Sequence, residues 1–339
     1  MRAILILSLT MIFFGSELFA GGHSSTLQDV KARGKLRCVV TTGLPGFAAP
    51  DANGVWRGFD WDFCRATAAA VFGDANAVDP ITSTGKTRFT KLNAGEGDVL
   101  WRNTTITFSR DVSVKLRFLG VNYYDGQGFM VNKSLGVSSA KELDGASVCI
   151  QTGTTTELNL ADFFSSNNMS YEAVTIETND EARQNYEAGR CDIYTTDASG
   201  LASTRSSLPN PNDHMVLPEI ISKEPLGPVV RQGDDNWFNI VRWSLNAMIN
   251  AEELGITAAN AASMANDNNP SVKRLLGTEG NFGEELGLSN DWAMNIVTQV
   301  GNYGESYERH VGLNTPIKLA RGVNNLWSQG GILYAAPIR

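Results

Sequence analysis

Short hydrophobic segments with the pattern of β-strands alternate with amphipathic segments along most of the chain. Runs rich in β-branched and aromatic residues are typical of strands, and the segments between them carry apolar residues at helical spacing. Strands that alternate with helices predict an α/β fold with mostly parallel sheets and helices on both faces. The expected strands are LRCVV (36–40), VKLRFLGVNYY (114–124), GQGFMVN (126–132), ASVCIQT (146–152), EAVTIE (172–177) and CDIYTT (191–196).

Helices are expected between these strands and near the C-terminus. In 59–73, Phe63, Thr67 and Val71 fall on one helical face, and Gly73 is suited to end the helix as a C-cap. Four further segments are predicted to be helical: TTELNLADFFS (155–165), NDEARQNYEAG (179–189), NDWAMNIVTQVGNY (290–303) and IKLARGVNNLW (317–327).

Polar side chains gather just after predicted strands, where the ligands of α/β sheets bind. A guanidinium donates two hydrogen bonds to a carboxylate, and hydroxyl and main-chain N–H groups can fill its other lone pairs. A carboxylate is the natural partner of a buried ammonium. Three segments of this kind, 97–111, 152–157 and 194–200, therefore predict a receptor for a small zwitterion. Its candidate residues are Asn103, Thr105 and Arg110 in the first segment, Thr154 and Thr155 in the second, and Asp197 in the third.

Each candidate also has a plain structural interpretation. Thr154 or Thr155 is suited to cap the helix after Gly153, although the free N–H groups there would also attract an anion. Asp197 is suited to cap the following helix, and Thr105 is a common strand residue. Both interpretations stay open at this point.

The N-terminus is typical of a secretory signal peptide in residues 1–20. Arg2 precedes an apolar run, 3–14, that is too short to span a bilayer, and cleavage is expected after Ala20. A membrane anchor is the alternative. A lipid anchor is not expected, because no cysteine that could carry it directly follows the apolar run.

Composition excludes some classes of function. A chain of 339 residues predicts two domains, and a net charge of −8 argues against nucleic-acid binding. The three histidines are isolated, which gives no metal or catalytic-triad spacing. An even number of cysteines in an exported chain indicates disulfides, with three possible connectivities, and buried thiols are the alternative. The four are Cys38, Cys64, Cys149 and Cys191.

Six strings, in order, carry a resemblance that spans about 26–339. They are GFDWDFCRA (58–66), TITFSRD (105–111), GASVCIQTGTTTE (145–157), GRCDIYTTDASGL (189–201), EPLGPVVRQGDDNWF (224–238) and QVGNYGESYERHVG (299–312) with PIKLARGVNNLW (316–327). The chain resembles the periplasmic solute-binding proteins of polar amino acid ABC transporters, and within them the general L-amino acid-binding branch.

The resemblance implies two lobes, each a mostly parallel sheet flanked by helices. Lobe 1 is expected to comprise 21–121 and 226–339 with a C-terminal helical extension, and lobe 2 is expected at 127–220. A two-strand hinge is expected at about 121–126 and 217–225. Disulfides within each lobe, Cys38–Cys64 and Cys149–Cys191, would leave such a hinge free to move.

The resemblance also assigns roles to the candidate residues. Arg110, Thr105 and Thr155 would hold the α-carboxylate of an L-amino acid, with Asn103 beside it, and Asp197 would hold the α-ammonium. Thr154 would cap the helix or contact the ligand. The loop residues Phe47, Leu44 and Trp101 are candidates for the side-chain pocket.

The protein is therefore expected to bind L-amino acids in the periplasm and to deliver them to the permease subunits of an ABC importer. It is expected to act as a monomer and to need no cofactor or metal. An enzyme of the same fold, similar to a cyclohexadienyl dehydratase or a lytic transglycosylase module, is the alternative. It would need a general acid or base in the cleft. The receptor segments offer only Glu157, one turn into its expected helix. A sensor domain of a membrane receptor is a third possibility.

Overall fold

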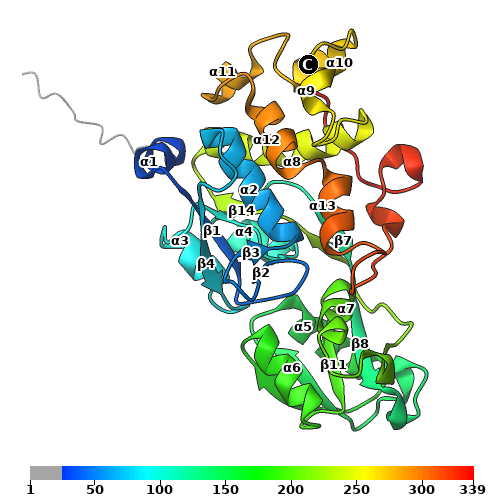
Figure 1. The fold of residues 1–339 in the computed structure, drawn as a ribbon. Coiled ribbons are helices and arrows are strands. Elements are labelled where there is room, and N and C mark those ends of the chain that lie inside the picture. Colours follow the sequence, from blue (N-terminus) through cyan, green and yellow to red (C-terminus); the bar gives the residue numbers. More distant parts are fainter. Residues whose placement is uncertain (1–24) are drawn as a thin grey trace, which may run out of the picture.

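The computed structural model describes residues 25–339, so the expected signal peptide lies outside the described part of the chain. The described residues form two lobes, each built on one five-stranded sheet (Figure 1). Within residues 25–339, no helix combines the length and hydrophobicity needed to cross a membrane.

The sheet of lobe 1 has the order β4-β1-β5-β14-β6. β1 runs parallel to β4 and β5, and β14 runs antiparallel to β5 and β6. The strands are β1 (Leu36–Thr41), β4 (Val78–Ser83), β5 (Val99–Leu100), β6 (Leu116–Phe118) and β14 (Val229–Arg231), with a small hairpin of β2 (Ala49–Pro50) and β3 (Trp56–Arg57). The helices are α1 (Thr26–Arg33), α2 (Phe59–Phe72), α3 (Arg88–Asn93), α4 (Phe108–Ser113) and α8 (Asp235–Glu253).

The sheet of lobe 2 has the order β10-β9-β11-β8-β12, in which β9, β10 and β11 are parallel and β8 is antiparallel to both its neighbours. Its strands are β8 (Gln127–Asn132), β9 (Ser147–Gln151), β10 (Glu172–Ile176), β11 (Ile193–Asp197) and β12 (His214–Val216). Its helices are α5 (Thr155–Ser166), α6 (Asn179–Glu187) and α7 (Ala198–Ser206), with 3₁₀ turns at Lys133–Leu135, Ala140–Glu142 and Pro211–Asp213.

Two antiparallel strands, β7 (Tyr123–Asp125) and β13 (Glu224–Leu226), lie where the chain passes between the lobes. The predicted α/β fold with two mostly parallel sheets is therefore confirmed. Helix α2 also ends as expected, because Gly73 adopts φ +68° at its C-cap.

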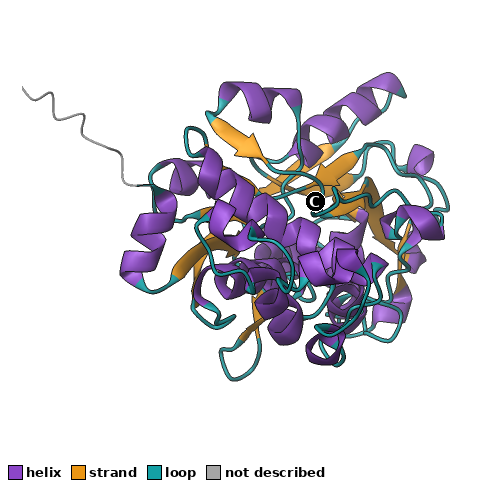
Figure 2. Cartoon of the chain, turned by 90° about the horizontal axis from the view of Figure 1, so that it is seen from above, coloured by secondary structure: helices purple, strands orange, loops and turns teal. Residues whose placement is uncertain are grey.

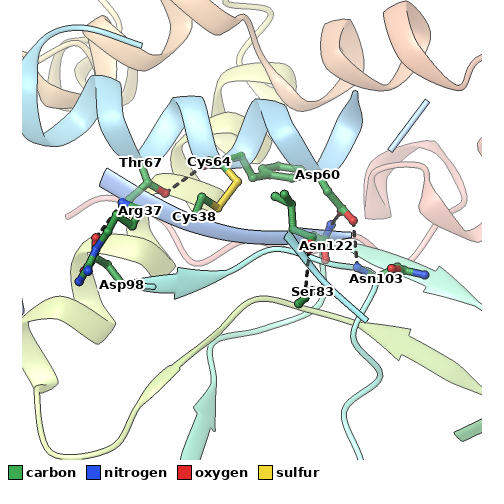
Figure 3. The surroundings of a disulfide bond; sticks show 11 residues. Arg37, Cys38, Asp60, Cys64, Thr67, Ser83, Asp98, Asn103 and Asn122 are labelled. Atoms are coloured by element: carbon green, nitrogen blue, oxygen red, sulfur yellow. Dashed lines mark hydrogen bonds and ion pairs between the residues drawn. A yellow bond between two sulfur atoms is a disulfide. The ribbon is translucent and has the colours of Figure 1, made fainter. Parts of the chain in front are cut away.

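The two disulfides are the expected ones. Cys38–Cys64 joins β1 to α2 (Figure 3), and Cys149–Cys191 joins β9 to the turn before β11. Because each bridge stays within one sheet and its covering segments, neither crosses between the lobes.

The C-terminal region packs on lobe 1, against α2 and α8 (Figure 1). Seen from above in Figure 2, helices cover most of this face of the molecule. Its helices are α9 (Ala261–Met264), α10 (Pro270–Leu275), α11 (Phe282–Leu286), α12 (Trp292–Val300) and α13 (Tyr303–His310). The single helix expected at 290–303 is interrupted at Gly301, where φ is +97°, and Asn302 begins α13 with a capping box.

The predicted helix at 317–327 is wrong. Only a 3₁₀ turn, Gly322–Asn324, forms there, with another at Trp327–Gln329. Lys318 has φ +59° and Gly322 has φ +50°, which break a helix. The Asn324 side chain instead accepts from the main-chain N–H of Tyr124 (2.7 Å) and donates to its carbonyl (3.0 Å), so the tail is held against β7.

A buried carboxylate on α2 fastens α13 to lobe 1. Asp62 accepts hydrogen bonds from Ser306 (2.8 Å) and His310 (2.9 Å), and it pairs with Arg309 and Arg65. Burial alone would raise the pKa of Asp62, but the hydrogen bonds and charges of His310 and Arg309 outweigh it and lower the pKa from 3.8 to about 2.

We expect this cluster to make stability depend on pH in the acid range. The folded pKa of Asp62 lies below its unfolded value, so its stabilisation is fully present above pH 4 and is lost as pH falls through about 2. The shift corresponds to about 2 kcal/mol. Urea unfolding should show Asp62→Asn less stable than wild type at pH 7, with the difference narrowing between pH 4 and pH 2. Asp79→Asn is the control. It removes an exposed ion pair with Lys35 and should lower the free energy of unfolding by less than about 1 kcal/mol. A difference for Asp62→Asn that stays constant with pH would contradict this account.

Candidate functional site

A small cavity lies between the lobes at the carboxyl ends of strands from both sheets. Lobe 1 contributes the ends of β4 and β5, and lobe 2 contributes the ends of β9 and β11. All of the lining side chains are polar or charged: Arg88, Arg102, Asn103, Thr105, Gln151, Thr154, Thr155, Thr156, Thr196 and Asp197. Five of the residues expected from the sequence thus lie together here.

The lobes are closed on this cavity. Asn179 on α6 donates to Thr41 at the end of β1 (2.8 Å), and Ser203 on α7 donates to the carbonyl of Pro45 (2.6 Å). Gly153 lies so near lobe 1 that a Cβ atom there would be 2.9 Å from Lys86 Cα, and its φ is +71°. The close approach and the backbone angle both require glycine.

Three arginines of lobe 1 are buried at the cavity without an acidic partner. Arg88 donates to the carbonyl of Gly85 and to the Thr104 hydroxyl, both at 3.2 Å. Arg102 donates to the carbonyl of Ser83 (3.2 Å). Arg110 lies just behind the cavity wall, 9% exposed, and donates to the carbonyl of Thr105 (3.1 Å). Of the ion pairs in residues 25–339, not one involves these three side chains.

Burial and mutual repulsion disfavour the charged forms of these arginines. Burial is the main cause that lowers the pKa of each, and the Arg110 charge contributes to the lowering at Arg102, whose pKa falls to about 10. The negative charges of Glu224 and Asp197 act in the opposite direction on Arg110. Guanidinium groups in this state have donors to spare and gain from an added anion.

Asp197 faces the arginines from lobe 2. It stands at the N-cap position of α7, yet its side chain makes no cap hydrogen bond. Asp125 on β7 accepts from the N–H of Ser199 instead (3.4 Å), so the capping interpretation of Asp197 fails and its carboxylate is free to face the cavity. Burial, followed by the negative charges of Asp125 and Glu224, raises the pKa of Asp197 well above its usual range. A cation in the cavity would relieve this repulsion.

Threonines cover the lobe 2 side. Thr154 is the N-cap of α5, and its hydroxyl accepts from the N–H of Glu157 (3.4 Å). The main-chain N–H groups of Thr155 and Thr156, in the first turn, have no carbonyl partner within a helix. The two interpretations of this segment, a cap and an anion receptor, are therefore compatible.

Asn103 lies on the lobe 1 side of the cavity, where its side chain interacts with Asp197 of lobe 2. Its main-chain N–H donates to Asp60 (2.9 Å, Figure 3), and its φ is +26°. The side-chain oxygen is buried without a hydrogen-bond partner in the described structure. A bound ligand with a donor group would satisfy it.

The aromatic candidates lie elsewhere. Phe47 is buried in the core of lobe 1 and meets Tyr123 edge to face, with ring centroids 6.0 Å apart. Trp101 stacks on Phe63 at 4.7 Å, and Leu44 belongs to the same core. None of the three lines the cavity, so the structure offers no support for their role in a side-chain pocket.

Three charged residues of the cleft, Arg88, Arg102 and Glu224, were not among the expected site residues. Arg102 directly precedes the candidate Asn103. Arg88 follows β4 in the polar run 84–88, and this polar run was the available signal. Glu224 is 1% exposed at the start of β13 and gathers donors from both lobes. Nothing in the local sequence marks it as a cleft residue.

A larger cavity, of about 500 Å³, lies on the outer side of lobe 1 between α2 and the C-terminal helices. Its cations already have acidic partners, because Arg65, Arg309 and His310 meet Asp62 and Arg57 meets Asp51. The buried arginines at the cleft, in contrast, have no acidic partner in the described structure. No group of three or more metal-ligating side chains occurs in the described residues.

Comparison with known proteins gives consistent matches. Residues 36–258 match the model of the bacterial extracellular solute-binding proteins, family 3. The glutamate/glutamine/aspartate/asparagine-binding protein BztA of Rhodobacter capsulatus is 61% identical, covering 96% of this chain and 98% of BztA. The general L-amino acid-binding periplasmic protein AapJ of Rhizobium johnstonii is 57% identical, covering 96% of this chain and 97% of AapJ.

A solved structure shares the fold over nearly the whole chain. It is an ABC transporter periplasmic binding protein from Brucella ovis with glutathione bound, which superimposes with a TM-score of 0.92 at 55% identity, covering 94% of this chain and 100% of that chain.

Proposed function

Since this chain belongs to the bacterial extracellular solute-binding proteins of family 3, we propose that it captures L-amino acids between its lobes, in the periplasm, and delivers them to the permease subunits of an ABC importer. The observation that carries the proposal is the set of three unpaired, buried arginines opposite a buried carboxylate in a closed cleft. A ligand with both anionic and cationic groups neutralises both sides at once.

The α-carboxylate is assigned to Arg110 and to the free N–H groups at the start of α5. Arg110 has a carbonyl partner but no acid partner in the described structure, and a helix N-terminus favours an anion. The α-ammonium is assigned to Asp197, whose carboxylate faces the cavity without a capping role.

Arg88 and Arg102 remain for the ligand side chain. Both line the cavity, and both have only carbonyl or hydroxyl acceptors. A second carboxylate, or a carboxamide oxygen, would satisfy their free donors. This favours glutamate, glutamine, aspartate and asparagine, the ligands named for the relative that is 61% identical.

The alternative of an enzyme is set aside because relatives that are 61%, 57% and 52% identical are named as amino-acid-binding proteins, the last of them as a putative amino-acid ABC transporter-binding protein. The family also accords with the expectation of an exported protein. Delivery, monomeric state and the residue roles are parts of the proposal.

A calorimetric ligand panel tests the proposal directly. Because Arg88 and Arg102 are cationic, we expect L-glutamate, L-glutamine, L-aspartate and L-asparagine to bind more tightly than L-leucine, and L-lysine to bind most weakly. Glutathione belongs in the panel because of the Brucella ovis structure. In a thermal-shift assay, ligand at about a hundredfold excess over Kd should stabilise the protein by about 2.7 kcal/mol. Protein stripped of endogenous ligand that binds none of these amino acids would overturn the proposal.

Arg110→Ala should weaken the binding of every amino acid, whatever its side chain, because all amino acids share the α-carboxylate. The expected loss is about 2–5 kcal/mol of binding free energy by calorimetry. Arg117→Ala is the matched control, since Arg117 is half exposed, pairs with Asp235 on the surface and is outside the cavity lining. Equal affinities for Arg110→Ala and wild type would remove Arg110 from the site.

Ligand should also compact the protein. The groups assigned to carboxylate and ammonium are divided between lobes, and one zwitterion reaches both only when the lobes approach to hydrogen-bond distance. Solution scattering of stripped protein should give a smaller radius of gyration with saturating L-glutamate. Gly153→Ala should reduce this change, because the added methyl meets Lys86 in the closed form. Gly136→Ala is its control, since Gly136 also has positive φ (+74°) but has open space around it. Full compaction of Gly153→Ala would contradict the closed geometry.

A further inference from the structure

Glu224 connects the two lobes through its carboxylate. It lies on β13, is 1% exposed, and accepts hydrogen bonds through Oε2 from the hydroxyls of Thr105 in lobe 1 and Thr155 in lobe 2 (2.8 Å for Thr155). Its Oε1 accepts from Asn159 on α5 and from Ser222, both at 2.7 Å. The carboxylate thus has four donors from three parts of the chain.

These bonds fix the direction of two hydroxyl protons. A threonine hydroxyl has one proton and two lone pairs, whereas a carboxylate can only accept. Thr105 and Thr155 therefore both point their protons at Glu224. Their oxygens are 3.3 Å apart, and with both protons used, neither can donate to the other or to a ligand.

This arrangement changes the chemistry that the two threonines offer. Both line the cavity, and both present lone pairs there. The expectation that their hydroxyls donate to the α-carboxylate does not fit this geometry. Two acceptors side by side suit a group with several N–H donors, and the α-ammonium has three.

The surrounding charges agree with this assignment. Two carboxylates face this corner, those of Asp125 on β7 and Asp197 at the end of β11. The guanidinium of Arg110 lies behind Thr105, and that of Arg88 lies opposite Asp197. The charge of Glu224 therefore adds to that of Asp197 at the side of the cavity assigned to the cation.

We propose that Glu224 is a positioning residue for amino-acid recognition, which holds the hydroxyls of Thr105 and Thr155 as paired acceptors for the ligand α-ammonium. The inference rests on the proposed function. Because Thr105 belongs to lobe 1 and Thr155 to lobe 2, the acceptor pair exists only when the lobes are closed. Recognition of the ammonium is thereby coupled to closure.

The test compares two ligands, L-glutamate and glutarate, of which only L-glutamate carries an α-ammonium group. In Glu224→Gln, the carboxamide has one accepting oxygen and one NH2 group, so it can no longer accept from all four donors. With the NH2 group toward the threonines, one of them accepts from it and turns its own proton to the cavity. Affinity for L-glutamate should fall by on the order of tenfold or more, the range for a hydrogen bond to a charged group. Affinity for glutarate, which lacks the ammonium, should change by less than about threefold. Equal losses for both ligands would show that Glu224 is only structural and would overturn the inference.

Two controls accompany this comparison. Glu219 is a matched control because its carboxylate also accepts hydrogen bonds, from the hydroxyl of Ser139 and the main-chain N–H of Ala140, but lies away from the cavity. Glu219→Gln should therefore change the affinity for neither ligand. Thr105→Ser should keep the discrimination between L-glutamate and glutarate, whereas Thr105→Val should reduce it. A Thr105→Val protein that discriminates as wild type does would count against the inference.

A crystal structure of the wild-type protein with L-glutamate gives an independent answer, whether or not Glu224→Gln folds or glutarate binds measurably. The ammonium nitrogen is expected within hydrogen-bond distance of the hydroxyl oxygens of Thr105 and Thr155. A ligand carboxylate in that place would overturn the inference while leaving the proposed function intact. Failure of the wild-type protein to bind any amino acid would instead remove the proposed function, and the inference with it.

Discussion

Arg88 and Arg102 are buried in the cleft and Arg110 is buried just behind its wall, and none of the three has an acidic partner in the described structure. Removing such charges from water costs several kcal/mol each unless an anion or hydrogen bonds compensate. This free-energy cost has to be offset by another interaction, and in the proposed function the compensating group is the ligand. The two sheets, with their facing carboxyl ends and the paired connecting strands, bring these cations opposite Asp197 in the closed cleft.

The sequence predicted the residues that directly follow recognisable strands. Thr155 and Asp197 were found because a hydroxyl and an acid stand out after the strands ASVCIQT and CDIYTT, whereas Thr105 was found from the polar run ahead of Arg110. Arg88 was missed because β4 was not recognised as a strand. Asp79 and Pro80 interrupt its apolar pattern, and proline is tolerated there only because β4 is an edge strand of its sheet. With the strand unrecognised, the polar run after it was not examined as part of the site.

Other differences between the expected and the observed site residues have a separate physical origin. Hydrophobicity shows that Phe47 and Trp101 are buried but not whether they face a cleft or a core, since that depends on partners such as Tyr123 and Phe63. Glu224 was invisible for a related reason. Its donors lie 119, 69, 65 and 2 positions away in the chain, so its role exists only once both lobes are folded and closed.

The division of charges between the lobes determines which step of binding can discriminate among ligands. Arg88, Arg102 and Arg110 all belong to lobe 1, so in the proposed function the α-carboxylate and the ligand side chain can be bound before closure. Asp197, Thr155 and the free N–H groups of α5 belong to lobe 2, and in the same proposal they act on the α-amino and α-carboxyl groups, which every amino acid shares. A ligand shifts the open–closed equilibrium only by the contacts it makes in one form and not the other. The lobe 2 contacts are of this kind. Closure then depends on the common part of the ligand and affinity depends on its variable part, so a protein built this way can accept several side chains and still present one closed form.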